Sequence, residues 1–140
     1  MYRFLDRALW EIDEPYRFLV AAMRLWVQRT RAGQCPCVAL APGFTYLHVE
    51  GALRDFSVAM GTLDRNALTT LRFGQRGGLA VLEDEARILA LFEMALAGEP
   101  DRVRRIAATL VTEGAVACLT TAVEWVALHL AQGVIEERDR

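Results

Sequence analysis

The stretch that decides the fold is residues 112–132, which read TEGAVACLTTAVEWVALHLAQ. Between Ala115 and Ala131 the only formally charged side chain is Glu124, and neither Pro nor Gly interrupts that run. A helix that is apolar around most of its circumference has to be covered by other elements. We therefore predict that this stretch is the central helix of a small all-α domain, with Glu124 at its thin solvated edge.

Length and composition indicate one globular domain. The chain has 140 residues, 54% of them hydrophobic and 24% charged, and a chain of this size buries enough surface to fold without a metal or a disulfide. Its sixteen basic residues are all arginine, which excludes Schiff-base and P-loop lysine chemistry and suggests a GC-rich, bacterial source. The formal net charge of −2 gives no electrostatic footprint for nucleic acid or an anionic membrane.

Targeting signals are absent from the sequence pattern. Residues 1–14 carry charges throughout and contain no apolar signal-peptide core. The apolar run of residues 112–132 is interrupted by Glu124, so we predict no membrane-spanning helix. We expect a cytoplasmic protein with no membrane partner, in a compartment where structural disulfides are rare.

Helical periodicity, together with start and stop signals, predicts five or six helices in an irregular bundle. Pro15 and Gly33 bound one helix, and Gly98 with Pro100 separates two others. The expected helices cover residues 15–32, 49–66, 83–98, 100–111 and 112–132; residues 1–13 form an N-terminal helix or docking arm, residues 34–48 and 67–82 form two loop regions, and residues 133–140 form a frayed tail. Whether residues 69–82 pair as a β-hairpin stays open. In the helix 15–32, the polar stripe consists of Arg17, Arg24, Gln28 and Arg31.

Cys35-Pro36-Cys37 is the motif that could carry chemistry. In an extended segment, residues i and i+2 point to the same side, and Pro36 favours an extended Cys35. The motif follows the predicted C-terminus of the helix 15–32, an end at which the helix dipole does not favour thiolates. The favoured interpretation is a pair of small thiols that pack a loop against the core. A metal site, a readily reduced disulfide and a contact with haem are the alternatives.

A metal site would need about four ligands. Cys35 and Cys37 supply two thiols, and His48 lies within reach of the same loop as a third ligand. Cys118 is a weaker fourth candidate, because we expect its thiol to lie in the core. Zinc or iron would suit such a set, although no cofactor is required by the sequence.

Self-association is the expected mode of action. The helices 15–32 and 112–132 are apolar over more surface than a small monomer readily covers. We therefore predict a binding or regulatory domain, homodimeric and without evident catalysis. The candidate partner surface consists of Trp125 and His129 on the central helix and of Tyr2, Leu5 and Leu9 in the N-terminal arm.

Two further patterns concern anionic partners. The helices 83–98 and 100–111 are spaced as in a helix-turn-helix, with Arg102, Arg104 and Arg105 at the start of the second helix. Residues 74–78, GQRGG, have the composition of a phosphate-binding loop before a helix. Because the helix 83–98 opens with Glu83-Asp84-Glu85 and the net charge is negative, we favour a plain helical hairpin without a nucleic-acid partner or a phosphate loop, and a helix-turn-helix DNA-binding regulator is the third alternative for the function.

Overall fold

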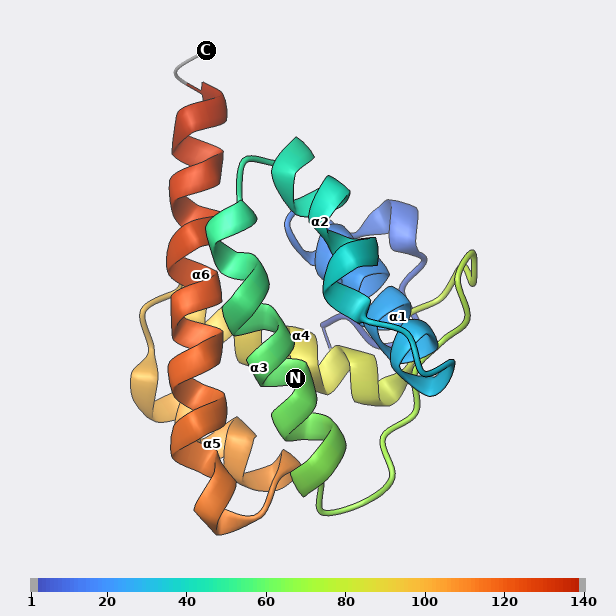
Figure 1. Cartoon of the computed structure of the whole chain (residues 1–140). Coiled ribbons are helices and arrows are strands. Elements are labelled where there is room, and N and C mark those ends of the chain that lie inside the picture. Colours follow the sequence, from blue (N-terminus) through green and yellow to red (C-terminus); the bar gives the residue numbers. More distant parts are fainter. Residues whose placement is uncertain (1–2, 139–140) are drawn as a thin grey trace.

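The computed structural model describes the backbone of residues 3–138 and the side chains of residues 3–133. The described part contains α-helices, short 3₁₀ turns and no β-strands, which confirms the predicted all-α class (Figure 1). The helices are α1 (Tyr16–Arg31), α2 (Pro36–Tyr46), α3 (Leu53–Asn66), α4 (Glu83–Leu96), α5 (Pro100–Leu110) and α6 (Val116–Arg138), and 3₁₀ turns cover Leu9–Glu11, Glu50–Ala52 and Glu113–Ala115.

The long helix α6 packs on one side only, against α3, α4 and α5. It runs antiparallel to α3, because Thr62 lies beside Cys118 whereas Gly51 lies beside His129. Leu119, Val123, Val126 and Leu130 face inward, but the opposite side of the helix is exposed. The predicted solvated edge at Glu124 is exposed, but the exposed side of the helix is much wider than the thin edge we predict from the sequence. The most enclosed helix is α4, which is buried at every position from Glu85 to Phe92 except Arg87.

The segment Glu113–Gly133 is long and apolar enough to cross a bilayer, judged by length and composition alone. In this fold, 44% of its most apolar window is buried against the rest of the chain. Core helices of soluble proteins meet the same criterion, so length and apolarity do not distinguish the two environments.

The region predicted as the first loop, residues 34–48, is mostly the helix α2. Pro36 occupies the first turn of this helix, where proline is well tolerated. The turn signal at Pro42-Gly43 proved misleading, because both residues lie inside the helix. The chain leaves α2 at His48, whose φ of +59° places it in the left-handed region.

The two ends of the described chain are the last turns of α6 and an N-terminal arm. α6 continues to Arg138, so residues 133–138 have a helical backbone. Residues 3–12 form an arm with a single 3₁₀ turn, and the arm pairs with residues 79–81 through backbone hydrogen bonds. The N–H of Asp6 donates to the carbonyl of Val81 at 3.1 Å, and the N–H of Leu9 donates to that of Leu79 at 2.7 Å.

The second predicted loop, residues 67–82, is irregular, and the described residues form no hairpin there. It is fixed instead by a buried ion pair between Arg24 of α1 and Glu85 of α4. Nε and Nη2 of Arg24 donate to the two carboxylate oxygens of Glu85, at 2.8 and 2.9 Å. Both side chains are almost wholly buried, so Arg24 does not belong to a solvated polar stripe.

The remaining hydrogen-bonding groups of this pair hold the loop. Arg24 donates to the carbonyls of Gly78 at 2.7 Å and Ala80 at 2.8 Å. Glu85 accepts from the backbone N–H of Gly74 at 3.0 Å and of Leu82 at 2.9 Å. Full pairing of both charges is the condition under which a buried ion pair is tolerated.

Removing one member of this pair should destabilise the protein strongly. For Arg24→Met or Glu85→Gln, we expect the free energy of unfolding to fall by about 3–5 kcal/mol. The remaining member of the pair would be a buried charge without its opposite charge, and backbone groups of the loop would lose hydrogen-bond partners. The double variant should lose less than the sum of the two single changes. Urea denaturation measures all three. As a control, Arg17→Gln breaks an exposed pair with Glu14 and should cost under about 1 kcal/mol; equal losses for Arg17→Gln and Arg24→Met would contradict this role.

Candidate functional site

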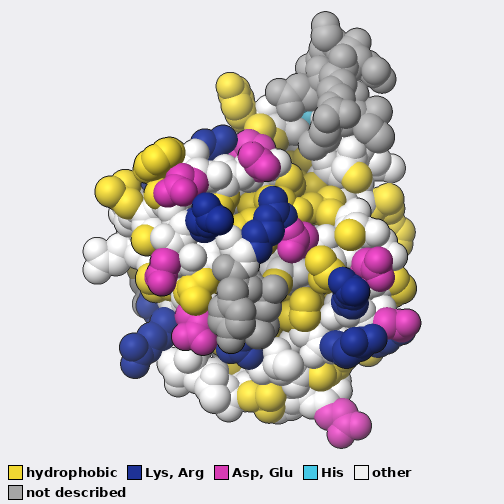
Figure 2. Space-filling view, turned by 180° about the vertical axis from the view of Figure 1, so that it is seen from behind, with side chains coloured by type: hydrophobic (Ala, Val, Ile, Leu, Met, Phe, Trp, Pro, Cys, Tyr) yellow, Lys and Arg dark blue, Asp and Glu magenta, His cyan; other side chains and the backbone are white. Residues whose placement is uncertain are grey.

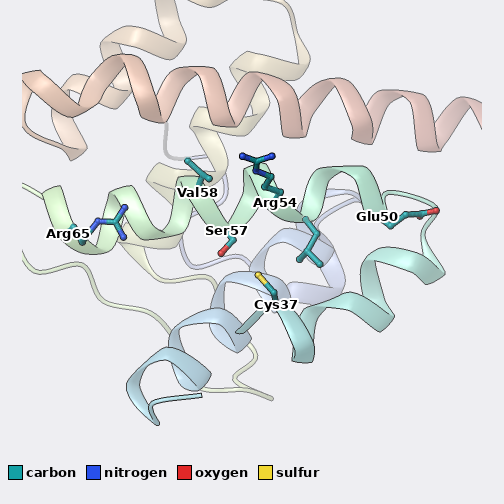
Figure 3. A pocket seen from close by; sticks show the side chains of 7 residues that line it. Cys37, Glu50, Arg54, Ser57, Val58 and Arg65 are labelled. Carbon is teal, nitrogen blue, oxygen red and sulfur yellow. The ribbon is translucent and has the colours of Figure 1, made fainter. Parts of the chain in front are cut away.

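An open hollow of about 550 Å³ lies where the first turn of α2 meets α3 (Figure 3). Cys37 and Ser57 point toward each other across it, whereas Arg54 and Val58 point toward α6. The hollow therefore continues onto the surface between α3 and α6. The lining residues are Cys37, Glu50, Leu53, Arg54, Ser57, Val58 and Arg65.

The polar groups of this hollow are a hydroxyl, a thiol and three charged side chains. The hydroxyl oxygen of Ser57 accepts a hydrogen bond from Nε1 of Trp26 at 3.2 Å, which ties it to the core of α1. No histidine is among the lining residues, so neither Cys37 nor Ser57 has an imidazole base within the hollow. The lining offers one thiol, one carboxylate and two guanidinium groups beside apolar surface.

Cys35 is extended, as predicted from Pro36, but Pro36 and Cys37 are helical, so the motif opens a helix instead of forming an extended segment. Cys35 is the N-cap residue of α2, and Cys37 lies in the first turn. The motif therefore adjoins a helix N-terminus, the end at which the macrodipole favours negative charge, and not only the C-terminus of α1. Both thiols are free; Cys35 is exposed and Cys37 is half-buried.

The four predicted metal ligands are not gathered into one site. Among the residues that the structure describes, no group of three or more His, Cys, Asp or Glu side chains could hold a metal ion. Cys118, expected in the core, is exposed, and its sulfur lies 3.7 Å from the hydroxyl of Thr62. It does not line the hollow that contains Cys37. His48 lies in the turn after α2, outside that lining as well.

The predicted partner surface is divided by the structure. Trp125 is 50% exposed on the outer side of α6. His129 is half-buried, and its ring lies so close to Gly51 that a Cβ at that glycine would meet Cε1 at 2.8 Å. Leu5 and Leu9 pack against the protein's own core, and Tyr2 lies outside the described residues. The exposed part of the predicted surface is thus on α6.

The predicted recognition-helix arginines lie at the start of α5. Arg102, Arg104 and Arg105 are exposed at the start of α5, but Arg104 forms an ion pair with Asp101. On the rear face of the molecule, basic and acidic side chains are interspersed (Figure 2).

Sequence reasoning missed the Arg24–Glu85 pair, and also Arg54 and Arg65 as lining residues. One signal for the pair was available in Gly74, where a Cβ would lie 2.5 Å from Nη2 of Arg24; a glycine at such a position indicates close approach of another group. Comparisons with protein-family models, curated proteins and solved structures found no match to this chain.

The three thiols should differ in their reaction with a thiol reagent under native conditions. Cys35 and Cys118 are exposed and Cys37 is half-buried, so Cys37 should react last, because access limits the rate. Ellman's reagent, applied to the wild type and to Cys35→Ser, Cys37→Ser and Cys118→Ser, assigns the phases. Fewer than three reactive thiols in the denatured, unreduced protein would contradict the free state of the Cys35–Cys37 pair.

Proposed function

We propose that the protein is a small binding or regulatory domain that acts as a homodimer through the outer face of α6. The observation that carries this proposal is the lack of charge on that face. Of the exposed side chains from Val116 to Gly133, only Glu124 is charged; the others are Ala117, Cys118, Thr121, Trp125, Leu128, Ala131 and Gln132. The solvent side of a helix in a soluble monomer is normally polar or charged.

Large apolar side chains lie at the centre of this face. Trp125 is 50% exposed and Leu128 is 46% exposed, and their spacing makes them neighbours on the helix surface. Val58 on the adjoining helix α3 is 39% exposed and points toward α6 (Figure 3). Exposed apolar patches of this kind are typical of interaction sites, and tryptophan is enriched among the residues that dominate binding energy.

A second copy of the chain suits this face better than a lipid surface. α6 carries no arginine between Val116 and Gly133, whereas helices that lie on anionic membranes use basic residues for attraction. The small side chains of Ala117 and Ala131, near the two ends of the face, protrude less than the large side chains of Trp125 and Leu128 between them. A face with a central ridge and low ends can be self-complementary in a two-fold contact.

Charge placed at the centre of this face should separate the two copies. For the wild type we expect twice the chain mass of 15.6 kDa in light scattering at tens of micromolar, and for Trp125→Glu or Leu128→Glu we expect the monomer, because the contact would bury an unpaired carboxylate. Trp10→Glu is the matched control, since Trp10 is 74% exposed on the N-terminal arm, and it should stay dimeric. A wild-type monomer refutes the proposal, and co-sedimentation with anionic vesicles would replace it with a lipid surface.

A second candidate is a thiol-dependent function of Cys35 and Cys37. It is favoured by the two free thiols in the first turn of α2, one of which opens into the hollow beside Ser57. Free thiols also suit the reducing cytoplasm that we propose as the location. A zinc or iron version would need a ligand from outside the described residues of one chain. Elemental analysis of protein purified without chelator tests it, and a stoichiometric metal would overturn the preferred proposal.

A further inference from the structure

A separate hollow of about 440 Å³ lies between the C-terminal half of α1 and the loop 73–76. Gln28 and Arg31 line it from α1, and Phe73, Gln75 and Arg76 line it from the loop, with Arg24 beneath them. Its lining contains three arginines and no acidic residue, although the chain as a whole has a formal charge of −2.

Two of these three positive charges are uncompensated. Arg24 is neutralised by Glu85. Arg31 and Arg76 are both exposed, and neither forms an ion pair with any other residue in the described part of the chain. The hollow therefore has an excess of two guanidinium groups, which are suited to carboxylate and phosphate oxygens because their N–H groups form a planar fork.

The loop that carries Arg76 is held from beneath. Arg24 donates to the carbonyls of Gln75 and Gly78, and Glu85 accepts from the N–H of Gly74. A ligand that used this loop would not have to order it first, which is the advantage of a preorganised site.

Two of the three acids at the start of α4 oppose an anion less than the sequence suggested, whereas Glu83 is exposed and has no ion-pair partner among the described residues. Glu85 is engaged by Arg24, and Asp84 accepts from the N–H of Arg72 and from the guanidinium of Arg87. At the other side of the hollow, carbonyls at the C-terminus of α1 accept hydrogen bonds from the N–H groups of Ala32, Gly33 and Gln34. These groups are therefore already paired.

Apolar surface adjoins the two arginines. A small cavity of about 40 Å³ shares Val27, Arg31 and Phe73 with this hollow and is walled by Trp26 and Met60 among others. One acid, Asp64, lines that cavity. An apolar group bound against Phe73 would therefore lie next to an oxyanion bound by Arg31 and Arg76.

We propose that this hollow binds a small organic oxyanion, a carboxylate or a phosphate monoester attached to an apolar or aromatic body. Arg31 and Arg76 hold the oxyanion, the amides of Gln28 and Gln75 supply further hydrogen bonds, and Phe73 packs against the body. Pockets for small molecules commonly combine a few convergent polar groups with apolar walls in this way. The site is distinct from the outer face of α6 and does not depend on dimerisation.

The test is a titration of the ¹⁵N-labelled full chain by NMR with four probes. Phenyl phosphate and benzoate carry both the oxyanion and the ring, benzyl alcohol carries the ring alone, and inorganic phosphate carries the anion alone. We expect phenyl phosphate, benzoate or both to shift the amide signals of residues 73–77 with millimolar or tighter affinity. Inorganic phosphate should bind at least about tenfold more weakly than the better ring-bearing anion, because it lacks the apolar contact. Benzyl alcohol should cause no saturable shift.

The variants Arg31→Gln and Arg76→Gln should each weaken the better probe by about tenfold, and the double variant should abolish binding. Both arginines are exposed, so the variants should fold, and thermal unfolding checks this. Arg102→Gln removes an exposed arginine of α5 that has no ion-pair partner among the described residues, and it should bind as the wild type does.

The outcomes separate the parts of the proposal. Binding of only one of the two ring-bearing anions supports it and identifies the head group. No binding of either anion, equal binding of benzyl alcohol, or an equal loss in Arg102→Gln overturns it. If inorganic phosphate binds as tightly as phenyl phosphate, the proposed contact between Phe73 and an apolar part of the ligand is refuted.

Discussion

The ion pair between Arg24 and Glu85 determines the course of the chain between α3 and α4. A buried ion pair contributes little net stability, because desolvation of the two charges offsets most of their attraction. Here both charges are also used to bind backbone groups of residues 74–82. The loop can take only a course that brings those groups to the pair, since any other course would leave a buried charge unpaired. We infer that the pair contributes specificity of the loop conformation more than stability.

This constraint reaches the N-terminal arm as well. Nη2 of Arg24 holds the carbonyl of Ala80, and the residues on either side of Ala80 form the backbone hydrogen bonds with residues 6–9. Phe4, on the arm, is buried in the core beside Tyr16. The arm and α1, which are close together in the sequence, and the start of α4, which is distant from both, are therefore placed relative to one another through one loop. The irregular part of this fold is as specifically held as its helices.

Local signals in the sequence predicted the helices that have clear ends, such as α4 and α5 around Gly98 and Pro100. They failed where the deciding interaction is distant or where the periodicity is weak. The partner of Arg24 lies far along the chain in Glu85, so spacing within α1 could only suggest a polar stripe. α2 was missed because Pro42-Gly43 has the composition of a turn. In α6, Glu124 indicated which side faces outward, but with so few polar residues the sequence could not show how wide the exposed side is, and we therefore placed Cys118 in the core.

The size of the exposed face of α6 limits what it can do alone. From Ala117 to Gln132 the helix is about 24 Å long and, with side chains, about 10 Å wide, which offers about 240 Å² to a partner. A stable interface covers about 800 Å² on each partner. A dimer contact would therefore have to extend beyond α6, and the adjoining helix α3 presents the exposed Val58 and Arg54 toward α6 (Figure 3). In the proposed dimer, a second copy seated on both α6 and α3 would lie over the Cys37 hollow, and this hollow would then belong to the same contact region as the outer face of α6.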